Sequence, residues 1–418
     1  MSATDTRVIL FMGKGGVGKT TIAAGSALLA AEAGERVAVT STDPAHSLGD
    51  ALGRSIGSSP MQITPGCHAQ QLSGRERLED SWNEVGGWLR RAFAWAGLDE
   101  LEAQELTLLP GLEELFALAE VAALAASGRF DTVMVDCAPT AETLRLLTLP
   151  EVLGFYLDRF DSQRSLRKTA GDALRRLGDL PIADAQLARA TRRLTDELAA
   201  VNSLLSADQT SVRLVLTPDR VVIAEARRTQ TALSLHGFNT DAVIVNRLLP
   251  DGLTDQFTKD WRTAQLARLS DVRSGFGGVD TLVAEMAASE PIGPDALVSL
   301  SRGLYEDRAP SAVLGRSQAM VVLTGAEGPE LHLPLPQADK AQVDLWAGDG
   351  EVHLTVGDHH RNLVLPGALA ALEVAGASFV DDVLVVRFRW RIGPRPTHTL
   401  KPWPIRSKMH LRRFNTLR

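Results

Sequence analysis

The chain has 418 residues, of which 44% are hydrophobic and 23% are charged, and its formal net charge is −7. This composition is ordinary for a globular protein, and the length exceeds one compact domain, so we expect two domains with appendages. The sequence holds no run of about 18 apolar residues and no signal-peptide pattern at its start, which argues against a membrane-spanning or secreted protein and predicts a cytoplasmic one.

The first motif is a glycine-rich loop between an apolar run at residues 8–12 and an alanine-rich helical pattern at residues 22–33. It matches G-x-x-x-x-G-K-[ST], in which backbone N–H groups and the helix N-terminus hold phosphate. In this pattern Lys19 reaches the β- and γ-phosphates, and the Thr20 hydroxyl binds Mg²⁺. The predicted ATP-binding loop consists of Gly13, Lys14, Gly15, Gly16, Val17, Gly18, Lys19, Thr20 and Thr21.

Strand patterns and helical patterns alternate after this loop. Further buried strands are predicted at residues 36–41, 131–135, 212–216 and 242–245. Residues 78–126 have a mostly helical pattern, and residues 155–206 form a helical insertion whose apolar face favours core or dimer packing over a client groove. This alternation predicts an α/β fold with a mostly parallel, doubly wound sheet.

Two carboxylates follow predicted strands at the sheet edge where ligands bind in this fold class. Asp136 is placed as a Walker-B-type carboxylate that holds Mg²⁺ through water, and Asp43 is placed to face the γ-phosphate. The alternative for either residue is a helix N-cap.

The second position of the loop adds a family resemblance. GKGGVGKTT, with Lys14 at that position, resembles the deviant phosphate loop of dimeric ATPases that include the arsenite-pump ATPases, the tail-anchored-protein targeting ATPases, the MinD/ParA partition ATPases and the nitrogenase iron protein. The resemblance implies that Lys14 reaches the partner subunit's nucleotide, where its charge assists phosphoryl transfer. The alternative is a solvated lysine.

Three further stretches resemble the arsenite-pump and targeting branch of this family: STDPAHSL at residues 41–48 (switch I), VDCAPTAETLR at residues 135–145 (switch II) and PGLEE at residues 110–114. The resemblance covers about residues 7–305. It implies that Asp43 positions the lytic water, that Asn246 hydrogen-bonds the adenine and that Asp219 contacts the nucleotide.

The C-terminal region changes character after a linker that begins at residue 309. Short strands predict a small antiparallel β-sandwich, at residues 320–323, 330–333, 343–346, 351–356, 361–365 and 383–388. Residues 376–384 resemble the A-x-x-x-x-G-x-L signature of α-crystallin (small heat-shock) domains, with Asp382 where glycine is usual. The combination resembles a bacterial and plastid subgroup of the targeting ATPases.

The sequence therefore predicts four parts. Residues 1–310 form a P-loop ATPase domain with a helical subdomain at about 60–130 and 155–206, residues 311–318 a linker, residues 319–390 the α-crystallin-like domain, and residues 391–418 an extended or disordered tail. The tail carries eight basic residues and no acidic one. Such a tail is usually solvated, so we expect no specific nucleic-acid partner and at most peripheral membrane contact.

The small number of cysteines argues against zinc-dependent and metalloid-dependent functions. The chain has only Cys67 and Cys137, so the zinc-binding pair of eukaryotic targeting ATPases and the metalloid-binding cysteines of arsenite pumps are both absent. We expect Mg²⁺ as the cofactor, with no zinc and no iron–sulfur cluster. The favoured function is an ATP-hydrolysing homodimer that binds and releases hydrophobic protein clients, membrane proteins among them. An anion-efflux ATPase, a passive holdase and a partition-type ATPase are the alternatives.

Overall fold

The computed structural model describes residues 6–43, 47–72, 112–137, 193, 196–197, 199–276, 279–317, 320–325, 328–348, 351–365, 369 and 372–390. Several predicted segments lie outside the described residues: parts of the two switch loops (44–46 and 138–145), most of the helical patterns (78–111 and 155–192) and the basic tail (391–418). None of the helices in the described ranges is long and apolar enough to span a lipid bilayer.

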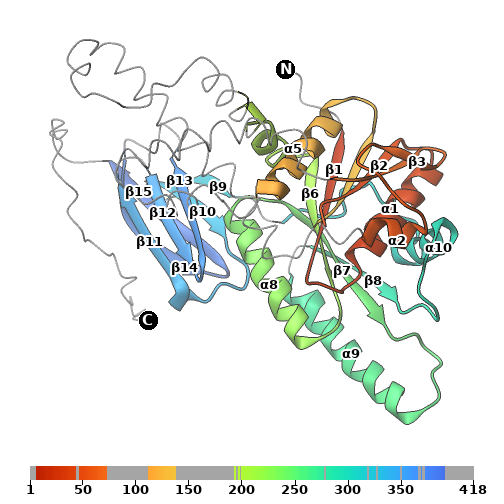
Figure 1. Cartoon of the computed structure of the whole chain (residues 1–418). Coiled ribbons are helices and arrows are strands. Elements are labelled where there is room, and N and C mark those ends of the chain that lie inside the picture. Colours follow the sequence, from red (N-terminus) through yellow and green to blue (C-terminus); the bar gives the residue numbers. More distant parts are fainter. Residues whose placement is uncertain are drawn as a thin grey trace, which may run out of the picture.

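The larger part of the chain is a twisted sheet with helices on both faces (Figure 1). Its strand order is β3-β4-β2-β5-β1-β6-β7-β8, and every neighbouring pair is parallel except β3 and β4. The strands are β1 Arg7–Met12, β2 Val37–Ser41, β3 Met61–Thr64, β4 Cys67–Gln71, β5 Thr132–Asp136, β6 Thr210–Leu216, β7 Thr240–Leu248 and β8 Asp280–Glu285. The predicted mostly parallel α/β fold is confirmed.

Helices cover this sheet because its central strands are apolar on both faces. In β1, Val8, Leu10 and Met12 pack in one core cluster with α5, α8 and α9, whereas Ile9 and Phe11 pack on the opposite face with α1, α2 and α10. The helices are α1 Lys19–Glu32, α2 Ser47–Leu52, α5 Leu112–Ala126, α8 Arg220–Leu235, α9 Gln256–Gly275 and α10 Pro294–Tyr305.

The predicted strands of the sheet are all observed, with shifted ends. β5 extends to Asp136, which the sequence placed just after the strand. β3, β4 and β8 were not predicted. Their sequences, MQIT, CHAQQ and DTLVAE, mix polar and apolar residues without the β-branched runs of the central strands. The helical subdomain was expected to begin at about residue 60, but β3 and β4 occupy that place. Among the described residues of its predicted range 60–130, the helix is α5.

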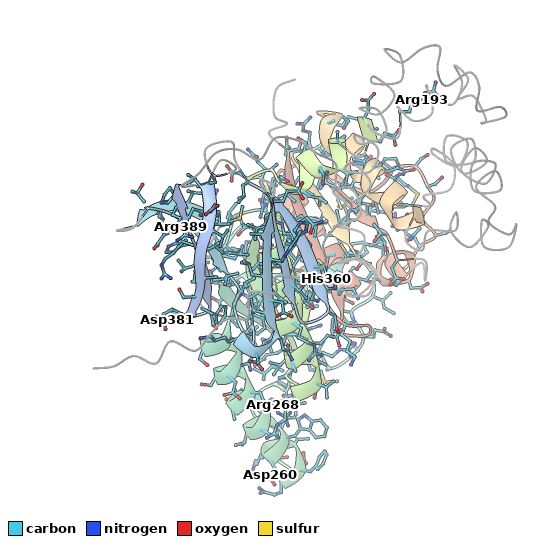
Figure 2. The ribbon with its side chains drawn as sticks, turned by 90° about the vertical axis from the view of Figure 1, so that its left-hand side faces the viewer. Arg193, Asp260, Arg268, His360, Asp381 and Arg389 are labelled. Atoms are coloured by element: carbon cyan, nitrogen blue, oxygen red, sulfur yellow. The ribbon has the colours of Figure 1, made fainter. Side chains whose placement is uncertain are left out.

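The C-terminal part is the predicted β-sandwich. One sheet has the order β14-β15-β10-β9 and the other β11-β12-β13. Figure 2 labels His360 on β13, Arg389 on β15 and Asp381 at the β14–β15 turn. The strands are β9 Val321–Gly325, β10 Gly328–Pro334, β11 Val343–Gly348, β12 Glu351–Val356, β13 His359–Val364, β14 Leu372–Val380 and β15 Val383–Trp390. β14 was not predicted as a strand, because a bulge between Val374 and Gly376 breaks its pattern.

Helix α8 joins the two parts of the protein (Figure 1). Leu235, at its C-terminal end, packs in the core of the sandwich. The Thr231 hydroxyl donates to the Pro336 carbonyl, and the Arg361 guanidinium donates to the Leu235 carbonyl. The sandwich is therefore fixed to the helix whose other end lies at the phosphate loop.

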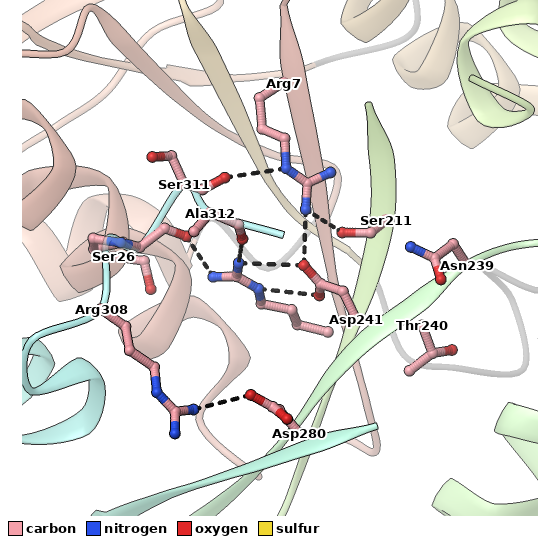
Figure 3. A network of polar contacts seen from close by, with 12 residues as sticks. Arg7, Ser26, Ser211, Asn239, Thr240, Asp241, Asp280, Arg308, Ser311 and Ala312 are labelled. Carbon is pink, nitrogen blue, oxygen red and sulfur yellow. Dashed lines mark hydrogen bonds and ion pairs between the residues drawn. The ribbon is translucent and has the colours of Figure 1, made fainter. Parts of the chain in front are cut away.

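Residues 309–317, here called the strap, connect α10 with the sandwich and cross the N-terminal edge of the parallel sheet. The Ser311 carbonyl accepts a hydrogen bond from Arg7 Nε at 3.1 Å. Two other strap carbonyls accept from Arg213 at 2.6 and 2.7 Å (Figure 3). The segment predicted as a linker is thus held against the sheet by two arginines.

The hairpin between β14 and β15 explains the unusual Asp382. Val380 pairs with Val383, so Asp381 and Asp382 form a two-residue turn, and both have positive φ (49° and 61°). Tight hairpins favour this conformation, and glycine adopts it without the strain that a side chain adds.

We expect Asp382→Gly to raise the free energy of unfolding by about 0.5–1 kcal/mol, because it removes this strain. Urea denaturation of the full chain measures the change. Asp344→Gly is the control: it places glycine inside β11, where it lowers stability. A loss of stability in both variants would show that the turn is unstrained.

Candidate functional site

The phosphate loop joins β1 to α1 and needs glycine at two close approaches. A Cβ atom on Gly13 would lie 2.1 Å from the Val215 carbonyl oxygen. A Cβ atom on Gly18, whose φ is 95°, would lie 2.4 Å from Asn246 Nδ2. The loop therefore lies directly against the ends of β6 and β7, with Gly15 and Gly16 exposed at its outer side.

Two polar side chains of α1 face the inner side of the loop. Lys19 is buried, and its Nζ donates to the Lys14 carbonyl at 3.3 Å. Thr20 Oγ1 donates to Asp136 Oδ2 at 2.8 Å and lies 3.0 Å from Ser47 Oγ, whereas Thr21 continues the helix. The predicted metal residues, Thr20 and Asp136, are thus brought together.

Asp136 is fully buried and only partly satisfied. Its Oδ2 accepts from Thr20 and, at 3.1 Å, from Ser41 Oγ, but its Oδ1 has no hydrogen-bond partner among the described residues. Burial raises the pKa of Asp136 to about 6, although the Thr20 hydrogen bond and the nearby Lys19 charge lower it. A buried carboxylate with a free oxygen beside two hydroxyls fits a hard cation such as Mg²⁺, which prefers oxygen ligands.

Asp43 lies at the end of β2, beside this cluster, because Ser41 of β2 pairs with Asp136 of β5. Its backbone is held on both sides. The Asp43 N–H donates to Ser41 Oγ at 3.2 Å, and its carbonyl accepts from Gln71 Nε2 at 2.8 Å. The Ser41 hydroxyl therefore links the predicted water-positioning residue to the predicted metal carboxylate.

Ser41, Ser47 and Gln71 were not identified from the sequence as site residues. The signal that could have found them is their place: Ser41 and Gln71 end neighbouring strands at the C-terminal edge of the sheet, where ligands bind in this fold class.

Three predicted residues lie on the outer side of the loop. Lys14 Nζ is 3.5 Å from Glu225 Oε2 of α8, and 43% of the Lys14 side chain is exposed. Asp219 precedes α8 and accepts from the Thr217 hydroxyl at 2.7 Å. Asn246 donates to the Val17 carbonyl at 2.8 Å and accepts from the next backbone N–H, so one N–H of its amide remains for another acceptor.

A cavity of about 440 Å³ adjoins this outer side. Its walls come from the phosphate loop, the start of α8, the end of β7 and the start of α9, and Lys14, Asp219 and Trp261 are among them. Its size suits a small organic ligand. A larger cavity of about 590 Å³ lies beside α2, but none of the predicted site residues lines it.

Comparison with known proteins agrees with this arrangement. Residues 6–306 match the family model described as anion-transporting ATPase, and residues 326–388 match the model of the HSP20-like domain found in ArsA. A Chlorobaculum tepidum protein, provisionally named arsenical pump-driving ATPase, is 31% identical over 389 residues, covering 91% of this chain and 96% of its own. A similarly named Aquifex aeolicus protein is 30% identical, and the match covers 91% of this chain and 99% of that protein. Protein Rv2184c of Mycobacterium tuberculosis is 35% identical, and the match covers 96% of this chain and 98% of that protein.

Proposed function

The chain belongs to the anion-transporting ATPase family, and from this premise we propose that ATP binding and hydrolysis switch a cytoplasmic homodimer between states that bind and release apolar segments of protein clients. The ATPase activity follows from the family. The client-binding role is supported by the HSP20-like sandwich, which is joined to the nucleotide-binding part through α8.

The inner side of the loop supplies the hydrolytic machinery of the proposal. Thr20, Ser47 and Asp136 would hold Mg²⁺, which neutralises phosphate charge when it is bound. Lys19 and the loop N–H groups bind the β- and γ-phosphates. The Asp43 carboxylate accepts a hydrogen bond from the attacking water and orients it in line with the γ-phosphate. Ser41 keeps Asp43 in place through its backbone N–H.

The observation that carries the dimer is the position of Lys14. Its ammonium lies on the rim of the loop against Glu225, half-exposed, so only a weak ion pair holds it in its own subunit. A facing subunit would offer it the negative charge that develops on the transferred phosphoryl group. A cation supplied in this way accelerates phosphoryl transfer by about 10³–10⁵-fold in other enzymes.

Mixing two inactive variants tests this role. Lys14→Ala and Asp136→Asn are each expected to hydrolyse ATP very slowly. In a mixed dimer, the Lys14→Ala subunit keeps its own Asp136 and receives Lys14 from its partner, so one of the two sites is complete. Equal mixing makes about half of the dimers mixed, and about a quarter of the wild-type rate should return.

Absence of recovery, although sedimentation shows that mixed dimers form with a non-hydrolysable ATP analogue, would mean that Lys14 acts within its own subunit. A monomeric protein under all nucleotide conditions would exclude the dimer itself. Mixing either variant with itself is the control, and it should stay inactive.

A second candidate is an anion-efflux ATPase stimulated by arsenite, which the names of the Chlorobaculum and Aquifex relatives favour. Thiolates bind this soft metalloid. However, burial raises the pKa of Cys67 to about 12 and also raises that of Cys137. Cys67 pairs with Val37 at the start of β2, whereas Cys137 follows the partner of Ser41 at the far end, about 16 Å further along the strand. Stimulation of the ATPase by arsenite, abolished by thiol alkylation, would support this candidate.

A further inference from the structure

The edge strand β9 of the sandwich is unusually apolar and exposed. Val321, Val322 and Leu323 are 43%, 48% and 48% exposed, and Met320 just before them is 39% exposed. Within the described part of the chain, β9 pairs only with β10, so its other edge is open.

These side chains do not serve the fold of the sandwich. Its core cluster takes residues from β10 to β15 and from α8, but none from β9. In the described part of the chain, one sheet of the sandwich has four strands and the other three, and β9, at the edge of the four-stranded sheet, supplies no residue to the core between them. Among the described residues, no core cluster includes a side chain of β9, and an exposed apolar strand of this kind calls for a partner.

The other three edge strands are protected. Natural edges carry charges or bulges that prevent pairing with other chains. β14 has Glu373 and a bulge between Val374 and Gly376, β11 has Asp344, and β13 has Arg361. β9, with the sequence VVLTG, has neither charge nor bulge. The absence of such protection at the β9 edge indicates that a strand of another polypeptide pairs there.

The backbone of β9 is arranged for strand addition. Thr324 lies opposite Pro329, which has no N–H to donate. Because hydrogen-bonded and non-hydrogen-bonded pairs alternate in antiparallel strands, the N–H and C=O groups of Val322 and Thr324 then point to the open edge. An incoming strand would find both backbone groups and apolar side chains there.

The size of this edge favours a peptide over a second copy of the chain. A five-residue strand is about 17 Å long, and a sheet is about 10 Å deep including its side chains. Two such edges bury only a few hundred Å², well below the roughly 1,200 Å² of a stable dimer. Backbone pairing also tolerates varied sequences, which suits transient clients.

We propose that β9 binds extended apolar segments of non-native polypeptides by strand addition. This inference rests on the proposed function, for which it names the client-binding surface and the recognised form of the client: an extended backbone with alternating apolar side chains.

The test measures binding of a fluorescein-labelled peptide of ten alternating valines and threonines, with lysine at both ends, to the full chain. Val322→Lys should weaken binding at least about tenfold, because a charge at the edge opposes pairing. Val380→Lys is the matched control: Val380 is 57% exposed on β14 of the same sheet, and its substitution should leave the affinity unchanged. A peptide N-methylated at four consecutive central residues cannot pair at either edge and should not bind.

Circular dichroism and the ATPase rate of each preparation establish that the variants are folded, since β9 contributes nothing to the core. Equal affinity of wild type and Val322→Lys would overturn the proposal, and so would equal binding of the N-methylated peptide or no binding by wild type. If Val322→Lys instead halved the molecular mass without peptide, the occupant would be a second copy, which also overturns it. The ATPase and subunit-mixing results are independent of all these outcomes.

Discussion

Asp241→Asn should lower the free energy of unfolding by about 3–5 kcal/mol, the range expected when one partner of a buried ion pair is lost. Asp241 is fully buried at the start of β7. Its Oδ2 accepts from Arg7 Nη2 at 2.8 Å, and its Oδ1 accepts from Arg213 Nε at 3.2 Å (Figure 3). One carboxylate therefore balances two buried guanidinium groups.

Removal of this charge leaves the two arginines without a counterion. Burial and the nearby Arg213 charge together lower the pKa of Arg7 to about 10 even with Asp241 beside it, so Arg7 remains charged at pH 7. The other hydrogen bonds of Arg213 go to the Tyr305 hydroxyl and to strap carbonyls and not to a second carboxylate. The strap should loosen with the sheet edge, because the same two arginines hold both.

The matched control is Asp131→Asn. Asp131 pairs with Arg36 close to the same edge of the sheet, but both side chains are about half-exposed. Exposed ion pairs contribute little to stability, so this variant should change it far less. Denaturation measures both variants, and hydrogen exchange at residues 310–312 reports on the strap. Equal effects of the two substitutions would show that burial of the network carries no special cost.

The network at Asp241 also shows where prediction from the sequence stops. The strands β1, β2, β5, β6 and β7 were predictable, because burial on both faces demands continuous apolar runs. Arg213 interrupts such a run in β6, and a charge in a central strand signals a buried partner. The sequence does not say that this partner is Asp241, 28 residues away, because only the pairing of β6 with β7 brings them together.

The residues of the candidate site likewise fall into those that the sequence predicts and those that it does not. Lys19, Thr20 and Asp136 follow from local motifs, because a phosphate loop fixes the position of its own residues. Gln71 donates to the Asp43 carbonyl and Ser41 donates to the Asp136 carboxylate, and both contacts are created by the lateral order of β4, β2 and β5. Strand order depends on long-range packing, so no local sequence motif identifies these polar residues as part of the site.

Asp136→Asn should abolish ATP hydrolysis and yet stabilise the metal-free protein at high pH. The loss of activity should reach about 100-fold, since the amide cannot replace a carboxylate beside a metal. The stability effect comes from the buried charge. Burial raises the pKa of Asp136 from 3.8 to about 6, so the folded protein binds this proton more tightly than the unfolded chain does. At about 1.4 kcal/mol for each pKa unit, the ionised carboxylate costs about 3 kcal/mol above pH 7.

The sign of the pH dependence follows. Below pH 4 the Asp136 carboxyl is protonated in both the folded and the unfolded protein, so it does not lower the free energy of unfolding. As the pH rises from 4 to 6, the carboxyl ionises in the unfolded protein first, and the free energy of unfolding of wild type falls. The stability of the variant relative to wild type, measured by denaturation in EDTA without nucleotide, should therefore rise over this range and stay constant above pH 7. Any fixed effect of the new amide cancels in this comparison. Asp131→Asn should show no rise over this range. The Arg36 hydrogen bond lowers the pKa of Asp131, so the stability of this variant relative to wild type falls with rising pH, and it does so only as the pH approaches 3.8 from below. If the free energies of unfolding of wild type and Asp136→Asn changed with pH in parallel, the Asp136 carboxylate would already be neutralised in the metal-free protein. Its unpaired oxygen would then not be a cation ligand.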